Sequence, residues 1–236
     1  MASSHSPNTE NLRKQAKALL RAWREHNPNS VTRVSEHYPE GRNFGLQDAQ
    51  FVLAREYGFR SWSALLEFLP RMGYFTDAYT FHISRAFDVS VDRLWSALSK
   101  PEQIGKWLLP VTFEPSVGST YEFACQPKLA GKIGVYDRHR AIRFDSDADA
   151  FWLFEIEPCD EKGSPRIQLT TVDRMTKESV DQYPGGVVEV WNPGVTAGWH
   201  QIIDALDHVL TGRQPTDIDY SRICRFYERL LERMIQ

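Results

Sequence analysis

The amino-acid sequence predicts an α+β protein in which an antiparallel sheet curls around one long C-terminal helix, preceded by a small all-α module. Two observations indicate this fold class. Apolar residues recur with helical spacing through about the first 70 residues and again near residues 195–210. Between these stretches, short segments rich in aromatic and β-branched residues are separated by turn residues, as in consecutive antiparallel strands. The sheet and the long helix can then bury their apolar faces against each other.

The N-terminal part contains four predicted helices. Leu12, Ala16, Leu19 and Trp23 form one apolar stripe of the first helix, which ends before Pro28. Three shorter helices are expected from Ser30 to about Pro39, from Leu46 to Tyr57 and from Ser61 to Leu69. The expected domains are a flexible N-terminus over residues 1–10, a helical module over 11–73, and a sheet domain with a trailing C-terminal helix over 74–236.

The second part is predicted to contain one strand, two helices, a meander of strands and the long helix. Ser90 is an expected N-cap for a helix that carries Leu94, Trp95 and Leu98, and a short helix follows from Pro101. A final amphipathic helix is expected over about 219–235. The expected strands are Tyr79–Val89, Val111–Glu114, Ser119–Cys125, Lys132–Tyr136, Ala141–Phe144, Phe151–Glu157 and Arg166–Asp173.

Composition and charge exclude several classes of function. The chain of 236 residues has 28 Lys and Arg against 31 Asp and Glu, a net charge of −3, so no nucleic-acid partner is expected. No apolar run reaches the roughly 20 residues needed for a membrane span. The N-terminus lacks the apolar core of a signal peptide, and three scattered cysteines are typical of reduced thiols, which together predict a cytoplasmic protein. HExxH, GxSxG, GxGxxG, CxxC and Walker motifs are absent, so no metal or cofactor is expected.

Aromatic residues are the most informative feature of the second part, since the chain has seven Trp, nine Tyr and 13 Phe. Several lie in elements that must face the interior between sheet and helix, where they form either a packed core or the wall of an apolar ligand cavity. Arg85, Glu155 and His200 are further candidates for orienting a polar end of a ligand, or surface residues if they face outward. The predicted wall residues are Trp107, Tyr121, Phe123, Trp152, Phe154, Trp199 and Ile203.

An ordered series of motifs over about residues 79–212 resembles one known family. The matching segments are Ile83–Phe87, Val91–Leu98, Pro101-Glu102, Lys106-Trp107, Val117–Phe123, Gly131–Gly134, Phe154–Pro158, Gly198–His200 and Leu210–Gly212, with Tyr227 in the usual trailing helix. They resemble the activators of the heat-shock-protein-90 ATPase, within the START-like (SRPBCC, helix-grip) superfamily. The resemblance implies an antiparallel sheet that grips a long helix, with a hydrophobic cavity between them, in a protein of bacterial type.

The sequence departs from this family between the last predicted strand and the long helix. Family members usually pass quickly between the two elements, whereas Arg174–Gly194 intervenes here and includes a strand-like stretch at Val187–Trp191. This segment is expected to be an extra sheet edge, a lid over the cavity mouth or a surface insertion.

The N-terminal module resembles a helical segment that precedes ankyrin repeats in some bacterial proteins, on the stretch Leu46–Trp62. No repeats follow it here, so the resemblance implies a docking piece for a protein partner. The helix–Gly–helix pattern at Ala54–Leu66 is also a feature of DNA-binding helix-turn-helix motifs. Because the second helix, Trp62–Leu69, has no Lys or Arg, DNA binding is not expected.

Three functions therefore remain open at this point. The first is a binding or carrier module for a small hydrophobic molecule. The second is an enzyme, such as a cyclase, dehydratase or hydrolase, that acts on a polyketide-like or other hydrophobic substrate in the same cavity, although no residue constellation supports it. The third is a co-chaperone-like interaction module that binds a protein partner through the N-terminal helices.

Overall fold

The computed structural model describes residues 8–38, 43–126, 128–146, 150–161, 164–191, 193–214 and 219–234. The first seven residues of the expected flexible N-terminus lie outside the described residues, and Thr9 already belongs to a helix. The chain forms two compact units, each taken by itself below. The helical unit comprises Met1–Met72 with Ile218–Gln236, and the sheet unit comprises Gly73–Asp217.

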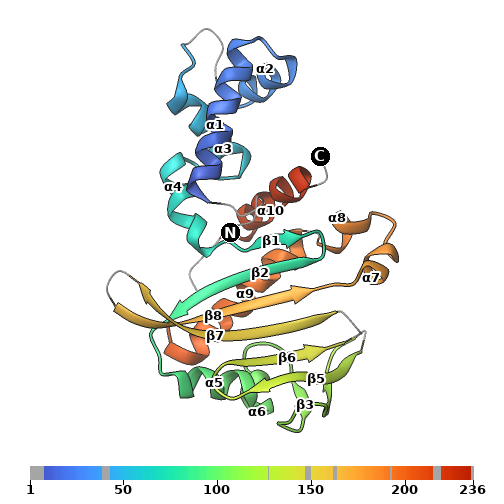
Figure 1. The fold of residues 1–236 in the computed structure, drawn as a ribbon. Coiled ribbons are helices and arrows are strands. Elements are labelled where there is room, and N and C mark those ends of the chain that lie inside the picture. Colours follow the sequence, from blue (N-terminus) through green and yellow to red (C-terminus); the bar gives the residue numbers. More distant parts are fainter. Residues whose placement is uncertain are drawn as a thin grey trace. The chain divides into compact units, whose positions relative to one another are not determined.

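The helical unit contains the four helices expected from the N-terminal sequence and one further helix from the C-terminal end (Figure 1). Asn8 begins the first helix, because its side chain accepts a hydrogen bond from the backbone N–H of Asn11. Ser61 caps the fourth helix in the same way through the N–H of Ala64. The elements are α1 (Thr9–Arg24), α2 (Pro28–Ser35), α3 (Leu46–Glu56), α4 (Trp62–Phe68), the 3-10 helix η1 (Leu69–Arg71) and α10 (Tyr220–Met234).

Helix α10 belongs to the helical unit, whereas the expected division placed it with the sheet domain. The Phe226 ring lies 5.2 Å from that of Tyr57, measured between centroids. Arg229 approaches the buried Glu56 carboxylate at 3.3 Å, and Arg33 binds both oxygens of the same carboxylate at 2.7 and 2.8 Å. An amphipathic helix packs where its apolar stripe is buried, and α10 buries its stripe against the N-terminal helices.

The sheet unit is built on eight antiparallel strands in the order β1-β2-β8-β7-β6-β5-β4-β3 (Figure 1). The strand β1 is not among the predicted strands, because a four-residue segment is too short to show a clear alternation. The other seven match the expected ones within a few residues. The strands are β1 (Tyr74–Asp77), β2 (Thr80–Phe87), β3 (Val111–Phe113), β4 (Thr120–Phe123), β5 (Leu129–Asp137), β6 (Ala141–Asp145), β7 (Phe151–Glu161) and β8 (Ser164–Arg174).

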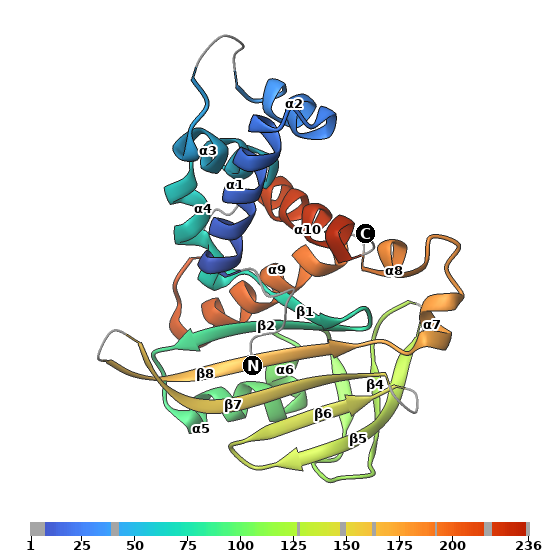
Figure 2. The same ribbon diagram turned by 45° about the horizontal axis from the view of Figure 1, so that its top comes forward.

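Three helices lie on one side of this curled sheet: α5 (Val91–Ser99), α6 (Pro101–Ile104) and the long α9 (Pro193–Thr211), as Figures 1 and 2 show. α9 contacts β2 and α5. The predicted fold class, an α+β protein with an antiparallel sheet curled around a long helix, is therefore confirmed. In the part of the chain that the structure describes, no helix is long and apolar enough to cross a membrane.

The segment between β8 and α9 forms two short helices, α7 (Lys177–Asp181) and α8 (Gly186–Val190). The expected strand-like stretch at Val187–Trp191 is wrong, because most of it lies in α8. Four β-favouring residues in a run of five do not determine a strand when no partner strand lies beside them. Trp191 anchors the segment. Its ring is fully buried against Phe75, and its indole N–H donates to the carbonyl of Ala78 at 2.9 Å.

Candidate functional site

The face of the sheet that meets α9 carries the predicted aromatic residues. Strand residues alternate between the two faces, so Trp152 and Phe154 of β7 point to the same side. Both contact Trp199 of α9, with ring centroids 5.4 and 6.3 Å apart. Trp107 lies edge-on to Phe154 at 5.7 Å. The side of the sheet that carries these rings is called the inner face below.

The structure brings the remaining predicted wall residues to the same cluster. Phe123 contacts Trp152 at 5.7 Å and Tyr121 at 5.5 Å, and the buried Ile203 lies one helical turn after Trp199. All seven residues are buried except Trp152, which is half-buried. The rings pack directly against one another. That they form the wall of a ligand cavity remains a prediction.

A carboxylate that the sequence did not single out lies inside this cluster. Asp173 of β8 is 3% exposed, and its two oxygens accept hydrogen bonds from the indole N–H groups of Trp152 at 3.1 Å and Trp199 at 2.9 Å. Burial raises the pKa of Asp173 to about 6, against the opposing effect of the two indole donors. The alternation of residues along β8 places Asp173 on the inner face. In the sequence, however, an aspartate near the end of a predicted strand looks the same whether it is functional or merely lies at the strand's end.

A second group of polar side chains lies on the inner face farther along the same strands. Arg85 of β2, predicted as a candidate for orienting a ligand, forms an ion pair at 2.8 Å with Asp204 of α9, and its side chain is 14% exposed. His200, a further candidate, is buried on α9 one turn before Asp204. Thr171 of β8 is 1% exposed. The arginine was predicted, whereas its partner Asp204 and the threonine were missed.

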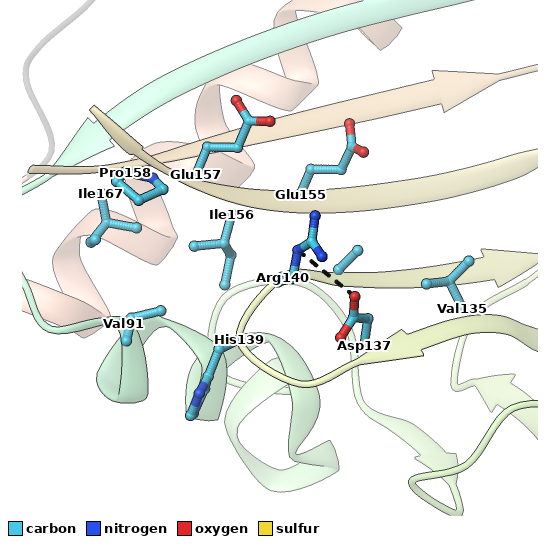
Figure 3. Close-up of a pocket in the computed structure, with 11 residues that line it drawn as sticks. Val91, Val135, Asp137, His139, Arg140, Glu155, Ile156, Glu157, Pro158 and Ile167 are labelled. Carbon is cyan, nitrogen blue, oxygen red and sulfur yellow. Dashed lines mark ion pairs between the residues drawn. The ribbon is translucent and has the colours of Figure 1, made fainter. Parts of the chain in front are cut away.

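Glu155, the third polar candidate, does not join this group. It is exposed, and Figure 3 shows its side chain pointing to the opposite side of β7 from that of Ile156. Glu155 lies instead at the edge of a pocket of about 790 Å³ between the start of α5, the β5–β6 turn and β7. The pocket is lined by Val91, Val135, Asp137, His139, Arg140, Ala141, Glu155, Ile156, Glu157, Pro158 and Ile167.

One apolar residue of this pocket, Ile156, belongs to the inner face. Ile156 of β7 pairs with Leu169 of β8, and Leu169 pairs with Arg85 of β2, so these three residues form one row across the sheet. Neighbouring strands lie about 4.8 Å apart, which puts the backbone of Arg85 about 10 Å from that of Ile156. In Figure 3 the side chains of Ile156, Ile167 and Val91 lie on the side of β7 away from Glu155 and Glu157. The pocket therefore adjoins the row that contains Arg85.

Two polar residues of the pocket, His139 and Arg140, lie in the β5–β6 turn, whereas Glu155 and Glu157 belong to β7. His139 has a left-handed backbone conformation, with φ 66°, and its ring nitrogen lies 2.9 Å from an Asp92 carboxylate oxygen. Arg140 approaches Asp137 at 3.8 Å, the ion pair marked in Figure 3. Among the residues that the structure describes, no three His, Cys, Asp or Glu side chains are grouped as metal ligands would be.

Comparisons with known proteins agree with this architecture. A solved structure of a conserved protein of unknown function from Enterococcus faecalis is similar over 66% of this chain and 85% of its own, with 18% identity and a TM-score of 0.50. CalU16 from Micromonospora echinospora has 18% identity and a TM-score of 0.41 over 66% of this chain and 87% of its own. The likeness to the Enterococcus protein supports the START-like fold. No curated protein sequence matches the chain.

A family model gives the stronger result. The model described as Activator of Hsp90 ATPase homolog 1-like protein matches residues 88–211. This range covers more than half of the 236 residues and lies entirely within the sheet unit. It includes α5, the meander from β3 to β8, and α9, whose contacts form the site described above. The chain belongs to the family of Activator of Hsp90 ATPase homolog 1-like proteins.

Proposed function

We propose that the sheet unit binds a small hydrophobic molecule, which enters at the Val91–Ile156–Ile167 pocket and reaches the inner face of the sheet. The observation that carries the proposal is that Ile156 lines the pocket and also lies in the row of the sheet that contains Arg85. A volume of about 790 Å³ lies within the range usual for small-molecule sites. Its lining combines apolar side chains such as Val91 and Ile156 with polar groups that can fix a ligand's orientation.

Binding of N-phenylnaphthylamine, a neutral dye that fluoresces in apolar surroundings, tests this proposal. The full chain should raise the dye's emission with saturable binding. Val91→Trp places an indole in the pocket and should weaken the affinity by about tenfold or more, the effect of losing some 1.4 kcal/mol of contact. Val117→Trp is the matched control, because Val117 is 64% exposed and does not line the pocket. Absence of dye binding, or equal binding by Val91→Trp, would contradict the proposal.

One observation favours a second candidate function, catalysis in the same interior. Asp173 combines deep burial with a pKa of about 6, and a carboxyl group with such a pKa can exchange protons near neutral pH. Both its oxygens are engaged by indole N–H groups, so catalysis would require that a substrate displace one of them.

A comparison of the wild-type chain with Asp173→Asn tests this second candidate. Each protein is incubated with a mixture of hydrophobic esters and ketones, and the mixture is analysed by mass spectrometry. Conversion by the wild type and not by the variant would support catalysis, provided that both proteins bind N-phenylnaphthylamine equally. No conversion by either protein leaves binding as the proposed function.

A further inference from the structure

Two side chains on the inner face present hydrogen-bond donors that the described protein does not use. The Nε and Nη2 atoms of Arg85 are buried and make no hydrogen bond with any residue that the structure describes, and the same holds for the Thr171 hydroxyl. Within the described part of the chain, Arg85 uses its Nη1 atom, in the ion pair with Asp204. A buried donor without an acceptor costs about 1–3 kcal/mol, so an aromatic core would be more stable without these groups.

The register of the strands brings the unused donors together. Arg85 pairs with Leu169, and Thr171 lies two residues farther along β8 on the same face. Such diagonal neighbours are about 7–8 Å apart at the backbone, a gap that a long guanidinium side chain spans readily. One acceptor atom between the two side chains can therefore receive hydrogen bonds from both. The row of Arg85 is also the row that leads to Ile156 and the pocket.

The charged groups around these donors indicate which kind of acceptor atom can bind there. The positive charge of Arg85 is already balanced by Asp204 at 2.8 Å. A second buried carboxyl group, Asp173, lies on the same strand and face as Thr171, two residues away. An anionic ligand would add negative charge beside these carboxyl groups in a region of low dielectric constant, where like charges repel strongly. A neutral oxygen acceptor uses the donors without this penalty.

We infer that Arg85 and Thr171 bind a neutral carbonyl oxygen of the hydrophobic ligand, such as that of a ketone, an ester or a quinone. This inference rests on the proposed function and adds the chemical class of the ligand. The apolar body of the ligand occupies the pocket beside Ile156, and its carbonyl end points along the inner face toward β2. Arg85 and Thr171 thus orient the ligand, while Asp204 holds the guanidinium in place.

Three related dyes test the inference on the full chain. The first is prodan, a dimethylaminonaphthalene that carries a propionyl ketone; the second is the same ring system without the acyl group; the third carries a carboxylate in place of the ketone. Prodan should bind about tenfold tighter than the dye without the acyl group, because one to two hydrogen bonds contribute about this much to the affinity. The carboxylate dye should bind more weakly than prodan. The emission of bound prodan should be red-shifted, as it is when the ketone accepts hydrogen bonds.

Two variants remove the donors with little change of shape. Thr171→Val replaces the hydroxyl by a methyl group and should weaken prodan binding about five- to tenfold and shift its emission to the blue. Arg85→Lys keeps a positive charge beside Asp204 but removes Nε and Nη2, and should have a similar effect. Thr170→Val is the matched control. Thr170 lies next to Thr171 on the opposite face, where it pairs with Ser84 at 3.0 Å. Neither threonine variant should change the binding of the dye without the acyl group.

The outcomes separate this inference from the proposed function. Equal affinity for prodan and for the dye without the acyl group, unchanged in Thr171→Val and Arg85→Lys, would overturn the carbonyl contact and leave hydrophobic binding intact. Tightest binding of the carboxylate dye would overturn the neutral acceptor. If none of the three dyes binds and N-phenylnaphthylamine does not bind either, the proposed function and the inference fail together.

Discussion

Trp199 and Asp173 are joined by a hydrogen bond of 2.9 Å, from the indole Nε1 to the carboxylate Oδ2. The contact joins the inner stripe of α9 to the end of β8 within the aromatic cluster of the inner face. The second carboxylate oxygen accepts the indole N–H of Trp152 at 3.1 Å. Two neutral donors do not neutralise a buried charge, so burial outweighs them and the pKa of Asp173 rises to about 6.

Asp173→Asn should remove a pH dependence from the stability of the sheet unit. A carboxyl group whose pKa is higher in the folded than in the unfolded chain stabilises the fold when protonated, and this contribution is lost as the pH rises from about 4 to about 6. Between pH 4 and pH 7 the wild type should lose about 2 kcal/mol more than the variant. Urea unfolding of both proteins at the two pH values measures the difference. Parallel pH profiles would contradict the assignment.

Trp199→Phe should lower the free energy of unfolding by more than the loss of buried ring surface alone would. The variant keeps most of the aromatic surface but removes a donor to a buried carboxylate, a loss of about 1.5–3 kcal/mol at neutral pH. The cost should shrink at pH 4, because the carboxyl group is then protonated.

Trp107→Phe is the control for this change, since the Trp107 indole donates to the neutral carbonyl of Ala97 at 3.0 Å. Its cost should be near 1 kcal/mol and independent of pH. Denaturant unfolding of both variants at pH 4 and pH 7 gives the comparison. A pH-independent cost for Trp199→Phe would show that the indole does not interact with the charged form of Asp173.

Trp191→Ala should release the segment of α7 and α8 from the sheet. The residue is 0% exposed, and loss of a fully buried indole costs about 3–5 kcal/mol. We expect faster cleavage within residues 177–190 by a nonspecific protease, with the rest of the sheet unit resistant for longer. Tyr183→Ala is the control, because Tyr183 belongs to the same segment and is 48% exposed. Equal cleavage of the two variants would mean that Trp191 does not hold the segment.

Deletion of residues 219–236 should disrupt the helical unit and leave the sheet unit folded. Phe226 and Tyr227 are fully buried, and their removal would expose Tyr57 and Phe59. The shortened chain should lose helical circular dichroism beyond that of α10 itself. A fragment of residues 73–217 should unfold cooperatively by itself. If the deletion changes nothing outside α10, or the fragment is molten, the division into two units is wrong.

The sequence predicts the fold well where periodicity is long and regular. The stripe from Trp199 to Leu210 predicts α9, and the aromatic residues of β7 identify the face that meets it. Four of the five residues at Val187–Trp191 have strand character, but the stretch lies mostly in a helix, because its neighbours in space decide its conformation.

The polar part of the candidate site is harder to predict than its aromatic part. An aromatic residue in an alternating strand indicates a core by itself, whereas Asp173 and Thr171 become unusual only when α9 covers them. The sequence also does not predict the unit to which α10 belongs. Its apolar stripe shows that one face of the helix is buried, but not which other helices or strands cover that face. A sequence pattern can therefore predict that a residue is buried, but it does not predict which residue it contacts.

The position of α10 has a consequence for the order in which the two units can be completed during synthesis. The sheet unit, Gly73–Asp217, lies in the sequence between the two segments of the helical unit, that is, between η1 and α10. A nascent chain makes α1 to α4 first, but the buried carboxylate of Glu56 meets Arg229 only after the whole sheet unit has been translated. The sheet unit has all its strands and α9 before then. Until α10 is made, Tyr57 and Phe59 therefore lack the Phe226 ring that packs against them in the folded chain.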